Sequence, residues 1–221
     1  MFSVKICGVR LKADLRSARA AGVDAVGLNF YPPSVRFLDP AAVQTRALSR
    51  EASESGLLRV GVFVDDSPAR IARVAETVGL DAVQLHGDEP AETAARLRGE
   101  GFRVIRAVKL PPGPLSIGQI RDAIEPVVAA EMHPLLDADG GSQHGGTGRR
   151  LDWAAIGQWA RAMPPRSWTL AGGLTPDNVA EAIRVTGATS VDVASGVERQ
   201  RGTKDALLIE RFLAEFRSGG G

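Results

Sequence analysis

The sequence predicts an α/β protein that folds as a single (β/α)8 TIM barrel. Short apolar runs rich in β-branched residues alternate with longer stretches of helical spacing, eight times along the 221 residues. The apolar runs show no inside/outside alternation, as expected for parallel strands that are covered on both faces. No linker or second domain is visible, so we assign residues 1–217 to one catalytic barrel domain and residues 218–221 to a disordered tail. An open doubly wound sheet is the alternative, but no Gly-x-Gly-x-x-Gly follows the first apolar run.

Composition excludes several classes of protein. The chain is 44% hydrophobic and 24% charged, which is typical of a globular protein. A net charge of +1 gives no reason to expect nucleic acid or an acidic membrane as a partner. The single cysteine cannot form an intrachain disulfide. With no signal-peptide pattern and no apolar run of about 18 residues, we expect a soluble, cytoplasmic protein that neither enters nor binds a membrane.

The first half of the chain contains four predicted strand–helix pairs. Gly22 is a typical residue after a helix end, and Asp39-Pro40 and Ser67-Pro68 each supply an N-cap followed by a proline in the first turn. The strands are Val4–Val9, Ala25–Phe30, Leu58–Val64 and Ala82–Leu85, and the helices run over 12–21, 39–53, 68–79 and from about Pro90 to Arg98.

The second half repeats this alternation. Its strands are Val104–Val108, Pro134–Ala138, Trp168–Ala171 and Ser190–Ala194, and its helices are Ser116–Ala129, Asp152–Ala162, Pro176–Thr186 and Thr203–Phe216. Between the sixth strand and the next helix lies a glycine-rich loop, residues 139–150, which we interpret as a mobile lid.

In this fold the active site lies at the C-terminal ends of the strands. The predicted strand ends carry more polar side chains and glycines than folding alone requires: Cys7, Asn29, Asp65, His86, Lys109, Asp137, Gly172-Gly173 and Ser195-Gly196.

The last two strand ends indicate a phosphate site. Gly172-Gly173 and Ser195-Gly196 would let backbone N–H groups approach an anion closely, and this fold often binds phosphate there. The alternative is that these glycines only form tight turns.

Cys7 is a candidate catalytic residue with a plain alternative, because a lone buried cysteine usually behaves as a small hydrophobe. Lys5 and Cys7 lie on the same face of their strand, since alternate strand residues point the same way. If that face is the barrel interior, the cation favours the thiolate, the form that can act as a base.

Asp137 and Arg36 are the other candidates. A carboxylate ending an apolar strand is either hydrogen-bonded structurally or held for proton transfer, and a raised pKa would suit a general acid; Asp139 is its rival. Arg36 is either a surface charge or a two-point grip for a substrate carboxylate. His86, His133 and His144 lack metal-ligand spacing, so we assign no metal.

Eight motifs in chain order resemble the phosphoribosylanthranilate isomerase family over essentially the whole chain. They are residues 5–8 (KICG), 27–30 (GLNF) with 33–36 (PSVR), 61–64 (GVFV), 84–89 (QLHGDE), 135–137 (LLD), 145–148 (GGTG) with 152–153 (DW), 170–179 (LAGGLTPDNV) and 192–198 (DVASGVE).

The resemblance implies an Amadori rearrangement of N-(5-phosphoribosyl)anthranilate without cofactor or metal. It implies that Cys7 is the general base, Asp137 the general acid and Arg36 the ligand of the anthranilate carboxylate. It also implies that the backbone at Gly172, Gly173, Ser195 and Gly196 binds phosphate and that Asp192 contacts ribose hydroxyls. The expected partner is this small molecule, and the protein is expected to be a monomer or a homodimer.

Two other functions fit a phosphate-binding barrel. A pentulose-phosphate epimerase would need paired carboxylates or metal-binding histidines at strand ends, and only His86 is placed for that. A sensor of phosphoribosyl ligands would use the same cavity without catalysis.

Overall fold

The computed structural model describes residues 1–138, 151–163 and 167–220. The barrel strands are β1 (Val4–Cys7), β2 (Ala25–Asn29), β3 (Leu58–Phe63), β4 (Ala82–Leu85), β5 (Val104–Leu110), β6 (His133–Ala138), β7 (Thr169–Leu170) and β8 (Val191–Val193). They pair in chain order, all parallel, and β1 pairs with β8 to close the barrel. The predicted (β/α)8 barrel is confirmed, and each strand lies within three residues of its predicted bounds.

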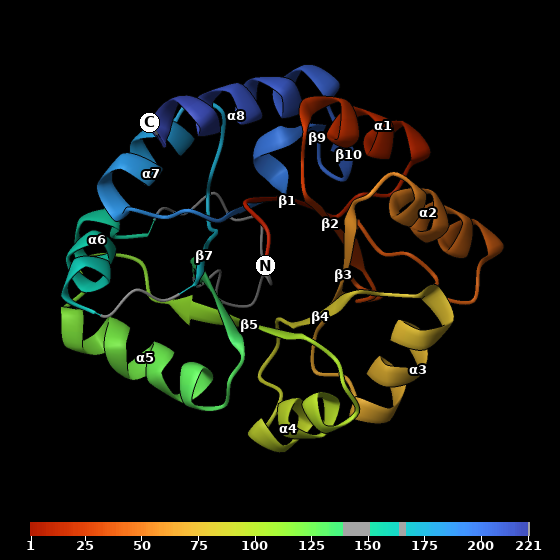
Figure 1. The fold of residues 1–221 in the computed structure, drawn as a ribbon, viewed down its shortest axis with the longest axis horizontal. Helices are drawn as coiled ribbons and strands as arrows, with labels where there is room; N and C mark the ends of the chain where they lie inside the picture. The colour runs from red at the N-terminus through yellow and green to blue at the C-terminus, as the bar shows by residue number, and fades with distance from the viewer. Residues whose placement is uncertain (139–150, 164–166, 221) are drawn as a thin grey trace.

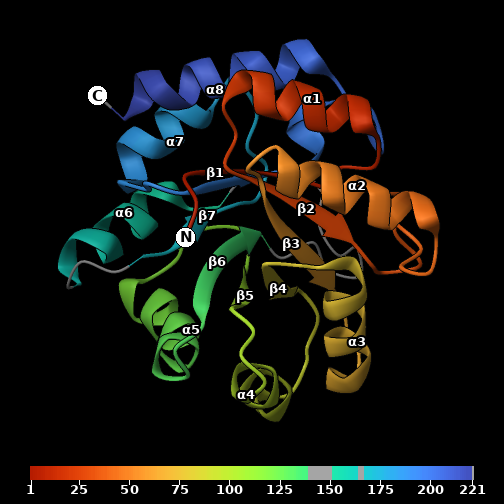
Figure 2. The ribbon, with the colours of Figure 1, turned by 45° about the vertical axis from the view of Figure 1, so that its right-hand side comes forward.

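Helices surround the barrel as an outer ring (Figures 1 and 2). They are α1 (Lys12–Ala21), α2 (Val43–Glu54), α3 (Pro68–Val78), α4 (Ala91–Gly99), α5 (Ile117–Ala129), α6 (Trp153–Ala162), α7 (Val179–Thr186) and α8 (Ala206–Gly219), with a short 3-10 helix η1 (Ser195–Val197) after β8. Local caps account for several helix ends. Gly22 follows α1 with φ +87°, and the Ser67 hydroxyl accepts a hydrogen bond from the Arg70 N–H at the start of α3.

Helices α2 and α7 begin later than the sequence predicts. The α2 helix begins at Val43 because the Asp39 carboxylate accepts from the Ala41 N–H in a separate turn, at 2.9 Å. The α7 helix begins at Val179 because Asn178 accepts from the Thr175 N–H, at 2.8 Å, and holds the preceding segment as a turn. In both places a side chain bonds the backbone in a non-helical conformation. The predicted lid, residues 139–150, lies outside the described residues.

A hairpin that the sequence reading did not predict lies between η1 and α8. Its strands, β9 (Glu198–Gln200) and β10 (Thr203–Lys204), pair antiparallel outside the barrel sheet (Figure 1). The last helix was predicted to begin at Thr203 but begins at Ala206, where the Asp205 carboxylate caps the first turn. This helix ends at Gly219, two residues beyond the barrel boundary drawn from the sequence.

Alternation along the strands separates two apolar layers. The larger cluster lies between strands and helices and includes Ile6 and Leu136, whereas a smaller cluster fills the barrel interior and includes Ala82 and Leu135. Lys5 and Cys7 flank Ile6 and share one face, as predicted, and this face is the barrel interior. The same alternation turns Gln84, Asp137 and Asp192 inward. Phe2 belongs to the interior cluster, and the N-terminus lies near the barrel axis (Figure 1).

A buried ion pair bridges the first and last strands. Lys5 lies opposite Asp192 in the β1–β8 register, and its Nζ is 2.7 Å from Asp192 Oδ1. Lys5 has no exposed surface, and Asp192 is 8% exposed. A charge in such a place is tolerated only when it is paired and hydrogen-bonded.

Removing one partner of this pair should destabilise the barrel strongly. We expect Lys5→Met or Asp192→Leu to lower the free energy of unfolding by about 3–5 kcal/mol, because each leaves an uncompensated buried charge. The double variant should lose less than the two single variants together, measured by urea denaturation. An exposed pair, Arg96 with Glu100 at 2.9 Å, is the control and should contribute less than about 1 kcal/mol. Additive losses at Lys5 and Asp192 would contradict the coupling.

Candidate active site

One cavity of about 280 Å³ opens at the C-terminal ends of the barrel strands. All eight residues to which the family resemblance gives a role line it: Cys7, Arg36, Asp137, Gly172, Gly173, Asp192, Ser195 and Gly196. Of the other strand-end residues named from the sequence, Asn29 and His86 also line it, whereas Asp65 and Lys109 do not. The eight residues come from six different segments between residues 7 and 196. The barrel brings them together because parallel strands place all their C-terminal ends at one rim.

Cys7 ends β1 and faces the cavity. The neighbouring strand provides space for its thiol, since a Cβ on Gly27 would lie only 2.8 Å from Cys7 Sγ. The backbone then turns at Gly8, whose φ is +75°, and the Gly8 N–H donates to the Gly27 carbonyl at 2.9 Å.

The thiol of Cys7 is harder to ionise than the sequence suggested. Burial raises its pKa most, and the lowering effect of Lys5 is the next largest influence. The negative charge of Asp192 then raises it again, so the net pKa lies above the ordinary value. The expectation of a thiolate favoured by Lys5 is therefore wrong, because burial outweighs the lysine and the charge of Asp192 adds to the effect of burial.

Asp137 ends β6 and contacts a histidine. Its Oδ2 lies 3.3 Å from His86 Nε2, and the Nδ1 of the same imidazole lies 3.0 Å from Gln84 Nε2. In this orientation of the Gln84 amide its nitrogen donates to His86 Nδ1, and His86 Nε2 lies within ion-pair distance of the Asp137 carboxylate. Sequence reasoning placed His86 at a strand end but did not give it this partner. Gln-x-His at the end of a strand was the available signal, because residues two apart share a face. The rival Asp139 lies outside the described residues.

The two glycine-containing loops pack against each other and against β6. Gly172 and Gly173 have φ values of +79° and +68°, a region that disfavours side chains. A Cβ on Gly172 would lie 3.1 Å from Asp137 Oδ1, and a Cβ on Gly196 would lie 1.9 Å from the Leu174 carbonyl oxygen. Glycine is therefore required here for the close approach of the loops.

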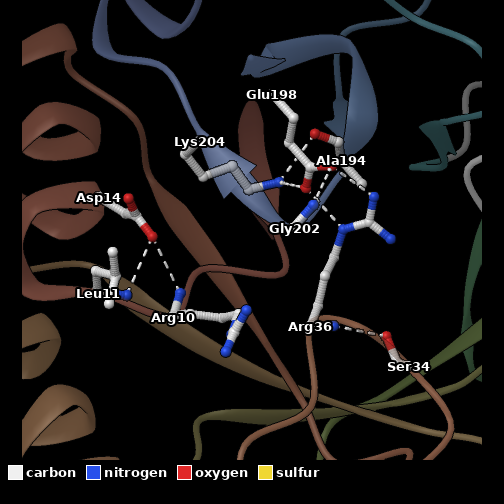
Figure 3. A network of polar contacts seen from close by, with 9 residues as sticks. All are labelled: Arg10, Leu11, Asp14, Ser34, Arg36, Ala194, Glu198, Gly202 and Lys204. Atoms are coloured by element: carbon white, nitrogen blue, oxygen red, sulfur yellow. Dashed lines mark hydrogen bonds and ion pairs between the residues drawn. The ribbon is translucent and has the colours of Figure 1, made fainter. Parts of the chain in front are cut away.

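Arg36 is bound by an acidic residue that the sequence reading did not single out. Its Nε and Nη2 donate to the two carboxylate oxygens of Glu198 on the hairpin, at 2.7 and 2.8 Å (Figure 3). Lys204 also donates to Glu198, at 2.8 Å. Burial opposes ionisation of Glu198, but hydrogen bonds from Arg36 and the charge of Lys204 lower its pKa to about 2. The alternative that Arg36 is an exposed surface charge is wrong, since it is 8% exposed.

Tyr31 and Arg201 are further titratable residues that line the cavity. Within the described residues, no group of three or more His, Cys, Asp or Glu side chains is arranged to hold a metal. His133 lies at the opposite end of the barrel, where its Nε2 forms a hydrogen bond with the Thr169 hydroxyl at 2.8 Å. Burial lowers the pKa of His133 to about 4. His144 lies outside the described residues. No helix in the part of the chain that the structure describes is long and apolar enough to cross a membrane.

Comparison with known proteins identifies one family. The family model of N-(5'phosphoribosyl)anthranilate (PRA) isomerase matches residues 4–215. The N-(5'-phosphoribosyl)anthranilate isomerase of Rhodospirillum rubrum is 41% identical over 98% of both chains.

Solved structures agree with that match. A phosphoribosylanthranilate isomerase in complex with reduced 1-(o-carboxyphenylamino)-1-deoxyribulose 5-phosphate is 36% identical, with a TM-score of 0.80 over 98% of this chain and 99% of that one. The enzyme of Thermotoga maritima is 37% identical with a TM-score of 0.83 over the same shares, and it has also been solved as monomers generated from its dimeric form.

Alkylation of Cys7 should report its raised pKa directly, because it is the only cysteine in the chain. We expect the rate of reaction with iodoacetamide to rise with pH to a midpoint above that of the urea-unfolded chain, since only the thiolate reacts. At neutral pH the native protein should therefore react more slowly than the unfolded chain. A native midpoint at or below the unfolded one would contradict the effect of burial.

Proposed function

The chain belongs to the N-(5'-phosphoribosyl)anthranilate isomerase family, and we propose the reaction and the residue roles that follow from that premise. The enzyme catalyses the Amadori rearrangement of N-(5-phosphoribosyl)anthranilate to 1-(2-carboxyphenylamino)-1-deoxyribulose 5-phosphate in tryptophan biosynthesis. The observation that carries the assignment of roles is the convergence of a thiol, a carboxylic acid, an arginine and two glycine-containing loops on one cavity.

Asp137 acts first, as the general acid. It gives its proton to the ribose ring oxygen while the C1′–O bond breaks, and the lone pair of the anthranilate nitrogen forms the iminium ion. The iminium makes the C2′ hydrogen acidic. His86, whose Nε2 lies 3.3 Å from the carboxylate, keeps Asp137 in position in the cavity.

Cys7 acts second, as the general base. Its thiolate removes the C2′ proton, the C–H electron pair forms the C1′=C2′ bond, and the iminium pair returns to nitrogen. The resulting enolamine becomes the ketone when C1′ gains a proton and the C2′ hydroxyl loses one. Electrons balance within the substrate, so the chemistry requires neither an oxidant nor a cofactor.

The raised pKa of Cys7 has two consequences for this step. Only a small fraction of the thiol is ionised at neutral pH, but that fraction is a stronger base than an ordinary thiolate. Lys5 lies on the same strand face and lowers the pKa against the effect of burial. The charge of Lys5 therefore limits how far the pKa of the Cys7 thiol rises above the working pH.

The substrate groups that do not react have separate contacts in this proposal. The phosphate binds to backbone N–H groups at Gly172, Gly173, Ser195 and Gly196, and the anthranilate carboxylate binds to Arg36. Asp192 contacts ribose hydroxyls while Lys5 holds its Oδ1. The protein acts in the cytoplasm as a monomer or a homodimer; sedimentation would distinguish the two.

Replacing either catalytic group should abolish most of the turnover. We expect Cys7→Ser and Asp137→Asn each to lower kcat about 100-fold or more, the size of a general acid–base contribution. The assay follows the loss of substrate fluorescence, and rescue of a tryptophan auxotroph blocked at this step is the second readout. Turnover close to the wild-type value in folded Cys7→Ser would show that the base is another group. Activity that is lost on chelation and restored by zinc would favour the epimerase alternative.

The loop contact at Gly196 should control phosphate binding. We expect Gly196→Ala to raise KM and to weaken competitive inhibition by inorganic phosphate about 10-fold or more, because the new Cβ would displace the loop from Leu174. Gly99→Ala, at a helix end with nothing within 4 Å of the added Cβ, is the control. Equal inhibition by phosphate in both variants would show that the phosphate does not bind at these loops.

A further inference from the structure

We propose that Glu198, supported by Lys204, is a positioning residue that aims Arg36 at the substrate carboxylate and ties this arginine to the phosphate-binding loop. The hairpin that carries Glu198 and Lys204 thereby makes the enzyme selective for N-aryl substrates that bear a carboxylate. The inference deepens the proposed function and rests on the role of Arg36 in it.

The contacts of Glu198 restrict it to one position. Its side chain is 2% exposed, and that of Lys204 is 1% exposed. Oε1 accepts from Arg36 Nε and Lys204 Nζ, at 2.7 and 2.8 Å, and Oε2 accepts from Arg36 Nη2 and the Gly202 N–H, at 2.8 and 2.9 Å. Four donors on two oxygens, all buried, leave this carboxylate little freedom to turn.

The fork determines the plane of the Arg36 guanidinium. Glu198 uses the edge formed by Nε and Nη2, so the edge formed by Nη1 and Nη2 keeps its remaining donors for another carboxylate. Figure 3 shows a terminal nitrogen of Arg36 directed away from Glu198. Because Arg36 lines the cavity, that edge is the one a bound substrate can reach.

The alkyl part of Arg36 is also held in place. A Cβ on Gly8 would lie 2.2 Å from Arg36 Cδ, so the side chain runs directly over the glycine that follows Cys7. The backbone N–H of Arg36 donates to the Ser34 hydroxyl at 3.1 Å. The backbone and the guanidinium of Arg36 are therefore both held in place before the substrate binds, which limits the conformational entropy lost on binding.

The charges of the cluster explain why Arg36 can still attract an anion although Glu198 is bound to it. Arg36 and Lys204 carry two positive charges against the single negative charge of Glu198. The cluster therefore keeps a net positive charge in a buried place, where it attracts an anion more strongly than an exposed arginine would. Lys204 thus offsets the neutralising effect of Glu198 on Arg36.

Lys204 also connects the cluster to the other end of the substrate. Its Nζ donates to the Ala194 carbonyl at 2.9 Å, and Ala194 directly precedes the Ser195–Gly196 segment of the proposed phosphate site. Glu198 and Lys204 therefore connect Arg36, which binds the substrate carboxylate in this proposal, to the loop that binds the phosphate. A substrate must carry both anions at a compatible separation to use both contacts.

The test compares two substrates that differ only in the carboxylate. N-(5-phosphoribosyl)anthranilate and N-(5-phosphoribosyl)aniline, each formed from the amine and ribose 5-phosphate, are assayed with wild-type enzyme, Arg36→Met and Glu198→Gln. We expect both variants to lower kcat/KM about 10- to 100-fold for the carboxylate substrate, mainly through KM, because a charge-assisted contact is lost or misaligned. For the aniline substrate the change should stay below about 3-fold. Glu210→Gln, on the exposed side of α8, is the matched control.

The outcomes separate the inference from the function beneath it. Carboxylate-selective loss in Arg36→Met without such loss in Glu198→Gln would overturn the positioning role while leaving the role of Arg36 intact. Equal loss on both substrates in Glu198→Gln would show a merely structural role and would also overturn the inference. If Arg36→Met itself shows no carboxylate selectivity, the assignment of Arg36 in the proposed function is wrong.

A second variant keeps the test decisive if Glu198→Gln does not fold. If thermal melting shows that Glu198→Gln is unfolded, Lys204→Met replaces it in the same assay. This variant leaves Glu198 to neutralise Arg36, so we expect the same loss of carboxylate selectivity. Wild-type selectivity in folded Lys204→Met would overturn the proposal.

Discussion

The ion pair between Lys5 and Asp192 is the interaction on which the centre of this barrel depends. It joins the first and last strands across the closure, and Lys5 lies with no exposed surface directly below Cys7. Each charge is tolerable there only because of the other. The pair also acts on the thiol: burial raises the pKa of Cys7 most, the charge of Lys5 lowers it and that of Asp192 raises it again. Stability and catalysis are therefore linked through the same two side chains.

The cavity above this pair is a consequence of parallel strand order. Cys7 on β1 and Asp137 on β6 face the same opening because alternation turns both inward and the barrel aligns their strand ends. The proposed acid and base therefore come from different strands of one rim. Glycines at the ends of β7 and β8 allow the loops to touch, and Gly172 also contacts the Asp137 carboxylate region. Packing of the proposed phosphate site and orientation of the acid are thus coupled.

A second buried cluster of charges, Arg36 with Glu198 and Lys204, lies beside the end of β1, where the Arg36 side chain runs over Gly8. It is built from a loop after β2 and from the hairpin that precedes α8. The two clusters differ in net charge, since Lys5 with Asp192 is neutral and this one is positive. The barrel therefore places its uncompensated positive charge where an anionic substrate group would lie. Such a division lets one small cavity hold a poorly ionised thiol and still attract an anion.

The sequence by itself determined the eight strand–helix units, the caps at Ser67 and Gly22 and the set of residues at the strand ends. These features depend on alternation, on N-caps such as Ser67 and on glycines such as Gly22, all of which act within a few residues. The late starts of α2 and α7 depend on local bonds of Asp39 and Asn178 that the sequence reading missed. Only the tertiary structure decided the β9–β10 hairpin, the partner of Arg36 and the raised pKa of Cys7. Arg36 and Glu198 are 162 positions apart, and Lys5 and Asp192 are 187 apart. Contacts over such separations arise from barrel closure, and the burial that governs the thiol exists only once the barrel has closed.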